Sequence, residues 1–230
     1  MNINKITVVI NTFKSEEKIF QCLNSINSQI KVYVIENSDN LHFKKEIEQK
    51  YKNVACFLTG ENLGYAKGNN FGLFKVMTDY ALILNPDAIL ETDAIDNFFA
   101  TASKKKDFAI IGPAKQNEFS KKEDENIEKE NVFEVENLKG FAMFLNMKKF
   151  KDIGFFDENF FIYLEEIDLC KRLRKMNRKI YLDKNIKIKH LGGSSHNNSI
   201  KHEMELSRNW HWMWSTFYFN KNTMVIFSLY

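Results

Sequence analysis

The 230-residue sequence has only three cysteines, Cys22, Cys56 and Cys170, which are widely spaced and form no CxxC pair. An odd set of isolated thiols fits neither a disulfide framework nor a zinc site. It fits free thiols in a reducing compartment. The sequence therefore predicts a cytoplasmic protein.

The sequence also has neither a membrane-spanning run nor a strong charge imbalance. No apolar run reaches the length of a transmembrane helix. Residues 1–5 lead directly into a strand-like run, so we expect no signal peptide. A formal net charge of +3 gives no polyelectrolyte signal for nucleic acid. With 44% hydrophobic residues, the chain is long enough to bury the core of one domain.

Short apolar runs alternate with helical patterns along the first half of the chain. Runs that are apolar on both faces are typical of buried parallel strands, and their alternation with helices predicts a doubly wound, mostly parallel α/β sheet. We expect strands at 5–10, 31–35, 54–58, 80–84 and 108–112. We expect helices from Ser15 (with Ile19, Cys22, Leu23 and Ile26 facing inward) and at 41–51, 70–77 and 88–102.

The second half of the chain is less regular. Residues 115–131 mix charges and have almost no apolar side chains, so we expect a solvated loop or a lid that orders on binding. Residues 132–146 predict strands that run through Gly140, since glycine in a strand often marks close backbone approach. A short helix and two short strands are expected at 148–153, 178–182 and 186–189.

An aromatic, helical tail is expected at 201–230. It contains Trp210, Trp212 and Trp214 together with basic residues. One interpretation is a helix that packs on its own domain. The other is an interfacial helix on a membrane surface, with tryptophan and basic side chains at the level of the lipid headgroups.

Polar residues follow several of the expected strands. In open α/β sheets, ligands bind outside the carboxyl ends of the strands. Asp87 follows Pro86, which ends its strand because proline donates no ladder hydrogen bond. We expect Asp87 to face the same crevice as Glu36 and Asn62, although a single aspartate in a turn is often only a turn residue.

Three glycines, Gly64, Gly68 and Gly72, recur every four residues. This spacing is neither the dinucleotide fingerprint nor a P-loop. One interpretation is a tight turn followed by a closely packed helix. The other is a backbone that a nucleotide can approach, with Lys67 near a phosphate.

The segment 160–172 (FFIYLEEIDLCKR) places Glu165, Glu166 and Asp168 within one helical turn, on a helix with an apolar stripe that starts at Phe161. Like charges at this spacing repel, although the positive end of the helix dipole tolerates them. One interpretation is an acidic first turn in which Asp168 pairs with Arg172. The other is a general base beside a site for a cation or sugar hydroxyls.

Taken together, these motifs resemble the family 2 glycosyltransferases. NLGYAKGNN (62–70), LNPD (84–87) and GFFDENFFIYLEEIDLCKR (154–172), followed by His190, have the order and spacing of that family. The resemblance spans about residues 5–195, and the nearest subgroup is similar to bacterial rhamnosyltransferase-type enzymes of surface polysaccharide synthesis. It implies a GT-A fold and inverting transfer of rhamnose or a hexose from a dTDP- or UDP-sugar to a glycan or lipid-linked acceptor.

The resemblance also implies a role for each site residue. The nucleotide would be bound by Thr12, Phe13, Glu36, Asn37, Asn62, Lys67, Asn70 and Asn85. Residues 85–87 stand where the family has its DxD motif, so Asp87 is the expected ligand of Mn²⁺ or Mg²⁺, with His190 as the second. Glu166 stands at the general base, with Glu165 beside it.

Elementary chemistry supports these roles. A divalent cation stabilises the charge that develops on a diphosphate leaving group, and carboxylate with imidazole suits Mn²⁺ or Mg²⁺. Inversion needs a base on the other side of the sugar, and like-charge repulsion raises the pKa of one glutamate toward working pH. Because Asn85 replaces the first acid of DxD, a non-catalytic binding subunit is the main alternative; a nucleotidyltransferase is a third.

The expected organisation is a GT-A domain at 1–200 and the aromatic tail at 201–230. The domain would comprise a nucleotide-binding half (1–112) and an acceptor and catalytic half (132–200). The expected location is the cytoplasm, with peripheral attachment at the inner face of the cell membrane as an alternative use of the tail.

Overall fold

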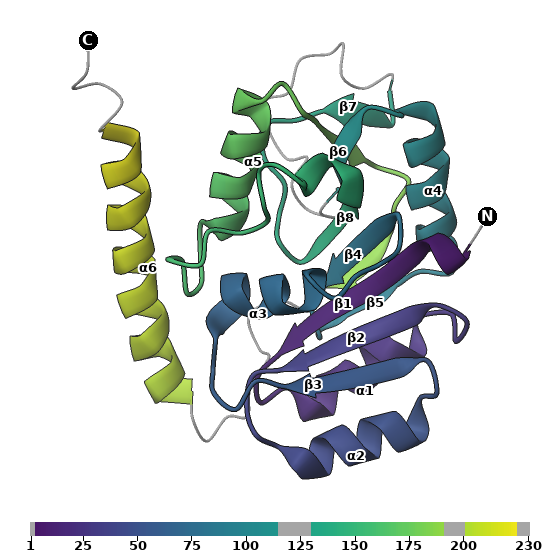
Figure 1. Cartoon of the computed structure of the whole chain (residues 1–230), viewed down its shortest axis with the longest axis vertical. Coiled ribbons are helices and arrows are strands. Elements are labelled where there is room, and N and C mark those ends of the chain that lie inside the picture. Colours follow the sequence, from purple (N-terminus) through teal and green to yellow (C-terminus); the bar gives the residue numbers. More distant parts are fainter. Residues whose placement is uncertain (1–2, 115–129, 191–200, 225–230) are drawn as a thin grey trace.

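The structure, a computed structural model, describes residues 3–114, 130–190 and 201–224 (Figure 1). Eight strands form one sheet in the order β3-β2-β1-β4-β8-β6-β9-β7. The bounds of these strands are β1 Ile6–Thr12, β2 Lys31–Glu36, β3 Val54–Leu58, β4 Tyr80–Leu84, β6 Phe108–Pro113, β7 Val132–Glu134, β8 Ala142–Asn146 and β9 Lys179–Asp183.

The predicted mostly parallel arrangement is confirmed for the first four strands. β2 pairs in parallel with β1 and β3, and β1 pairs in parallel with β4. The later strands mix directions, because β8 runs antiparallel to β4 and β6, and β7 runs antiparallel to β9. Since β8 lies between β4 and β6, the two halves expected from the sequence share one sheet.

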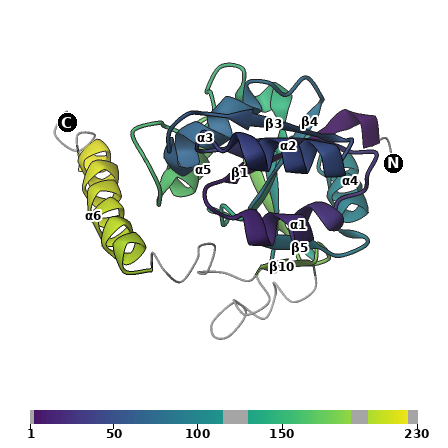
Figure 2. The ribbon, with the colours of Figure 1, turned by 90° about the horizontal axis from the view of Figure 1, so that it is seen from below.

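Helices cover both faces of the sheet (Figures 1 and 2). β1 shows why: Val8 and Ile10 point to one side and Val9 to the other, because successive strand residues alternate. On the Val8 side pack α1 (Glu16–Asn24), α2 (Leu41–Lys50) and α4 (Ala94–Lys104). On the Val9 side pack α3 (Gly64–Leu73) and α5 (Glu165–Lys175).

Several predicted elements are wrong in their extent. The helix expected at 70–77 begins at Gly64, and residues 88–90 form a strand, β5 (Ala88–Leu90), before α4. β5 pairs antiparallel with β10 (Ile188–His190) in a separate two-stranded sheet. Gly140 lies in a turn between β7 and β8, not in a strand. Short 3-10 helices occur at Ile3–Lys5 and Met147–Phe150.

Helix α6 (Lys201–Met224) confirms the predicted helical tail and stands beside the domain on the side of α5 (Figure 1). It is attached through hydrogen bonds. Ser215 is fully buried, and its Oγ donates to the backbone oxygen of Ile162 at 2.8 Å. The Tyr218 hydroxyl donates to Asp157 Oδ2 at 3.0 Å. The predicted loop at 115–131 lies almost wholly outside the described residues.

Candidate active site

A cleft of about 660 Å³ opens where β1, β2 and β4 end at their carboxyl edge. This is the edge at which open α/β sheets bind ligands. Seven of the predicted site residues line the cleft: Thr12, Phe13, Asn37, Asn62, Asn85, Asp87 and His190. The structure thus places predicted site residues from five separate segments around one cleft, and their roles stay predictions.

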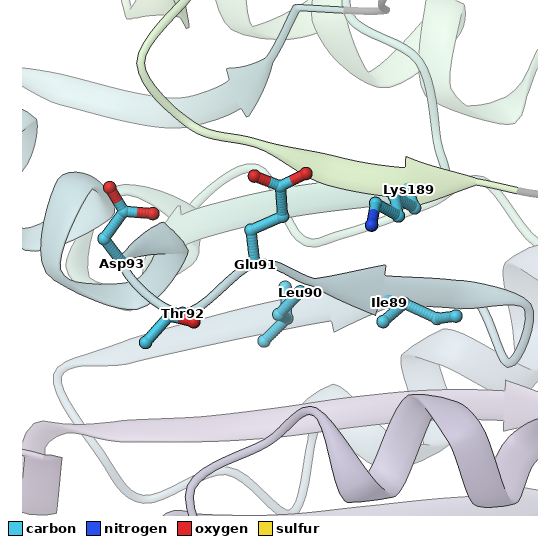
Figure 3. A pocket seen from close by; sticks show the side chains of 6 residues that line it. All are labelled: Ile89, Leu90, Glu91, Thr92, Asp93 and Lys189. Atoms are coloured by element: carbon cyan, nitrogen blue, oxygen red, sulfur yellow. The ribbon is translucent and has the colours of Figure 1, made fainter.

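Asp87 and His190 meet at one wall of this cleft. Residue 87 immediately precedes β5, and the register pairs His190 with Ala88 (Figure 3 shows the two strands side by side). His190 Nε2 lies 3.3 Å from Asp87 Oδ1, and the imidazole stacks on Phe141 with 4.6 Å between ring centres. Burial favours the neutral acid, but hydrogen bonding from His190 prevails and holds the pKa of Asp87 below its ordinary value.

This pair fits a divalent cation. Asp87 is only 5% exposed, so its carboxylate is fixed, and its charged form is favoured by the imidazole beside it. One oxygen and one nitrogen donor suit Mn²⁺ in particular, with ligand phosphates and water completing the shell. Within the described part of the chain there is no group of three or more His, Cys, Asp or Glu that could hold a metal by itself.

A second hollow, of about 440 Å³, lies along β5 and β10 and is lined by Ile89, Leu90, Glu91, Thr92, Asp93 and Lys189 (Figure 3). None of the predicted site residues lines it. It is lined by the last two residues of β5, by the three residues that follow them and by Lys189 of β10. We therefore use it below only as a source of control substitutions.

The glycine repeat packs α3 closely against the sheet. A Cβ on Gly68 would lie 2.5 Å from Asn11 Oδ1, and one on Gly72 would lie 2.5 Å from Val9 Cγ1. Asn11 and Asn37 both donate to the backbone oxygen of Gly64, at 2.9 and 3.0 Å. These contacts favour the close-packing interpretation and fix the start of α3 at the cleft, where Gly64 is itself a lining residue.

We expect Gly64→Ala to destabilise the protein more than Gly60→Ala. Both glycines have positive φ (+75° and +79°), so either alanine suffers left-handed strain of about 1–2 kcal/mol. At Gly64 the new Cβ would also lie 2.3 Å from the Phe161 oxygen, whereas nothing lies within 4 Å at Gly60. Overpacking adds about 1–3 kcal/mol. Urea unfolding measures both losses, and equal losses would contradict this packing.

Glu36 and Thr12 lie side by side in register at the ends of β2 and β1. Glu36 does not line the cleft and is 1% exposed; its Oε1 accepts from Ser38 at 2.6 Å. Glu36 Oε2 and Thr12 Oγ1 have no hydrogen-bond partner among the described residues. Burial raises the pKa of Glu36 to about 7. Two unpartnered polar atoms under the cleft are the kind of group that a bound base could satisfy.

Two predicted nucleotide ligands lie away from the cleft lining. Asn70 is buried and clamps the segment before α5: its amide donates to the Phe156 oxygen at 2.9 Å and to Glu158 at 3.0 Å, and it accepts from the Phe156 N–H. Lys67 is exposed and is not among the residues that line the cleft. Neither Lys67 nor Asn70 is therefore placed to contact a nucleotide in the cleft as the structure stands.

Glu165 and Glu166 begin α5 behind the cleft wall and do not line the cleft themselves. Burial raises the pKa of Glu165 to about 8, and the charge of Glu166 adds to this effect. Burial also raises the pKa of Glu166, against which Lys139 acts. Oε2 of each has no partner in the described part of the chain. Burial therefore raises the pKa of both members of this pair, and the two carboxyl groups titrate as a unit.

The third acid has a structural role. Asp168 accepts from Arg172 at 2.7 Å, as the i+4 spacing predicts. The same guanidinium also donates to the backbone oxygens of Ile153 and Phe155. The prediction that the helix already includes Phe161 is wrong, because α5 starts only at Glu165.

The residues just before Glu165 form a strained turn. Tyr163 and Leu164 have φ of +76° and +67°, a left-handed conformation that costs non-glycine residues about 1–2 kcal/mol each. The turn is held from two sides: Tyr65 N–H donates to the Phe161 oxygen at 2.6 Å, and Ser215 donates to Ile162. Such strain persists where the surroundings enforce it and is common at active sites.

Sequence reasoning missed a contribution of α6 to the cleft. Ser207, Arg208 and His211 are among the lining residues, and His211 stacks on Phe161 with 4.2 Å between ring centres. No role was expected for His211. The signal available was only the presence of polar residues in an aromatic helix, which does not reveal the side that faces the domain.

The arrangement of strands and helices is that of solved GT-A structures. S. aureus TarS in complex with UDP has a TM-score of 0.61 at 17% identity, covering 80% of this chain and 59% of that one. Mannosyltransferase PcManGT from Pyrobaculum calidifontis, in complex with GDP-Man and Mn²⁺, has a TM-score of 0.64 at 14% identity, covering 79% and 55%. At this identity the likeness shows the fold: α/β, of GT-A type.

Residues 7–170 match the sequence family described as Glycosyl transferase family 2, and the chain therefore belongs to that family. A curated relative is the low-salt glycan biosynthesis hexosyltransferase Agl10 of Haloferax volcanii. It is 26% identical over 200 residues, covering 77% of this chain. The chain spans 64% of the length of that relative. No helix in the described ranges is long and apolar enough to cross a membrane.

Proposed function

We propose that this protein is an inverting, metal-dependent glycosyltransferase of cell-surface glycan assembly. It would move rhamnose or a hexose from a dTDP- or UDP-sugar to a glycan or lipid-linked acceptor, as the bacterial rhamnosyltransferase-type enzymes do. The observation that carries the proposal is the pairing of Asp87 with His190 in a cleft whose wall adjoins two carboxyl groups of raised pKa. The hexosyltransferase Agl10 and the UDP and GDP-Man complexes described above support this substrate class.

In this proposal the nucleotide occupies the cleft at the ends of β1 and β2. Asn37 and Asn62 are lining residues with amide groups that suit ribose hydroxyls, and Phe13 offers a ring face to the base. The buried Thr12 Oγ1 would gain the hydrogen-bond partner that the described residues do not give it. Glu36 is paired in register with Thr12 but does not line the cleft, so its effect on the nucleotide would be indirect.

Asp87 and His190 would hold the cation, which when bound acts as a Lewis acid toward the diphosphate. Glu166 accepts the proton of the acceptor hydroxyl at a carboxylate oxygen as that hydroxyl oxygen forms a bond to the anomeric carbon. The bond from the anomeric carbon to the phosphate oxygen breaks, and its electron pair leaves with the nucleoside diphosphate. Attack from the side opposite the leaving group inverts the anomeric carbon.

Protonated Glu165 leaves the negative charge of the pair on Glu166, which is the state a base needs at neutral pH. Because Glu166 must be ionised, the rate should rise with pH through its raised pKa. Tyr65 lies beside the pair, and burial together with the charges of both glutamates raises the pKa of its hydroxyl well above its ordinary value.

The test is release of nucleoside diphosphate from a panel of UDP-, dTDP- and GDP-sugars, with Mn²⁺ or with EDTA. We expect release from a UDP- or dTDP-sugar that depends on the metal, and pyrophosphate should not form. Pyrophosphate would indicate a nucleotidyltransferase. Binding of UDP or dTDP without turnover on any donor and acceptor would indicate the non-catalytic binding subunit instead.

A further inference from the structure

Helix α6 divides into two faces that the sequence alone does not separate. Leu206, Trp210, Met213 and Phe217 follow one another at intervals of four, three and four residues, so they lie on one side of a 3.6-residue helix. They are 59%, 62%, 60% and 61% exposed. We call these four side chains the outer stripe.

The opposite side of α6 faces the domain. Ser215 is fully buried there, His211 stacks on Phe161, and Arg208 and Ser207 reach the cleft. Among the described residues, no other element lies on the outward side of α6 in either view (Figures 1 and 2). A helix that is already docked on its own domain thus also exposes four large apolar side chains, whereas the outward side of a docked helix is usually polar.

We propose that the outer stripe is a docking surface for the face of an anionic lipid bilayer. All three tryptophans of the protein are in α6; its two acidic residues, Glu203 and Glu205, precede Leu206, and Lys221 follows Phe217 by one helical turn on the side of the outer stripe. Tryptophan with basic residues and no acids is the chemistry of a helix that lies at the level of the headgroups. Because no described helix can span a bilayer, contact would be along the surface.

The area of the stripe argues against a second copy of the chain as its occupant. Four large side chains at about 60% exposure offer on the order of 500 Å². A stable protein interface buries roughly 800 Å² on each partner. A bilayer needs no such matched surface, since it receives each side chain separately and attracts the cations through its anionic lipids.

The position of α6 gives the contact a use that rests on the proposed function. The same turns that carry Leu206 and Trp210 outward carry Ser207, Arg208 and His211 into the cleft. A bilayer on the outer stripe would therefore lie across α6 from the cleft, about one helix diameter (roughly 10 Å) away, within reach of an acceptor anchored in that bilayer. Vesicle binding itself requires no catalysis, so it can be tested separately from transfer.

The experiment uses the full chain with vesicles of phosphatidylcholine, alone or mixed with phosphatidylglycerol. We expect sedimentation with the mixed vesicles and a blue shift of tryptophan emission, which reports α6 alone. The triple variant Leu206→Ser, Met213→Ser, Phe217→Ser should lose vesicle affinity more than about tenfold. Met77→Ser, which removes a 92% exposed methionine outside α6, should retain it.

Quenching of tryptophan fluorescence by brominated lipid reports which side of α6 faces the bilayer. A protein that keeps only Trp210 should be quenched strongly, and one that keeps only Trp212 should be quenched weakly, because Trp212 lies off the stripe against Tyr163. UDP binding verifies that each variant is folded. Equal vesicle binding by wild type and triple variant would overturn the proposal. So would a failure of wild type to bind vesicles, or a concentration-dependent dimer that the triple variant loses.

Discussion

Replacing Glu166 with glutamine is expected to lower the rate of sugar transfer by about 10²–10⁴-fold, the usual contribution of a general base. Glutamine keeps the size of the side chain but cannot accept the proton of the acceptor hydroxyl. Affinity for the nucleotide should remain, because Glu166 does not line the cleft. Steady-state kinetics, with calorimetric titration of UDP or dTDP, separate the two effects.

Glu165→Gln is the matched control. Since burial raises the pKa of Glu165 to about 8, the residue is already neutral at pH 7, and glutamine mimics that state. We expect most of the transfer rate to remain at pH 7. Above pH 8 the wild type acquires a second buried negative charge, so the two proteins should diverge there. Near-normal transfer by Glu166→Gln would contradict the assignment of Glu166 as the base. So would a loss of transfer in Glu165→Gln alone.

Asp87→Ala should abolish the metal dependence of UDP or dTDP binding and weaken binding in Mn²⁺ by at least about 100-fold. Losing even an outer partner of a metal site costs about 10–100-fold, and Asp87 is proposed as a direct ligand. Asp87 is 5% exposed and lies 3.3 Å from His190. No other residue that lines the described cleft has a carboxylate to replace it. Calorimetric titration with Mn²⁺ and with EDTA measures the difference.

Asp93→Ala serves as the control for this change. Asp93 is an exposed aspartate of the second hollow and makes no capping hydrogen bond at the start of α4. The Asp93→Ala protein should bind nucleotide and metal as the wild type does. If Asp87→Ala kept its Mn²⁺-dependent affinity, the ligand assignment would fail. If the wild type bound neither nucleotide, the family match would indicate shared ancestry of fold without the reaction.

The sequence predicted the cleft better than it predicted the elements around it. Asp87 and His190 were expected together because the family resemblance implies that both are metal ligands, and the structure places them in contact. By contrast, the strand Ala88–Leu90 was assigned to a helix, since its partner lies at Ile188–His190 and three residues carry no readable period.

The start of α3 was missed for a different reason. Glycine is a poor helix former, so Gly64 and Gly68 suggested a turn. Packing against Phe161 and Asn11 overrides that preference, and such long-range contacts are not written in local sequence. The orientation of α6 is of the same kind. Aromatic residues occur around the whole helix, and only its contacts with the domain separate a buried side from the outer stripe.

The buried carboxyl groups couple folding to proton uptake. Glu36 and Glu165 have ordinary pKa values of 4.5, which the folded protein raises to about 7 and about 8. Between these values the unfolded chain has released protons that the folded chain still holds. The slope of the free energy of unfolding against pH is therefore negative, and this contribution to stability, complete in acid, is lost as pH rises through 7 and 8. Glu36 and Glu165 therefore contribute least to the stability of the protein in alkaline solution.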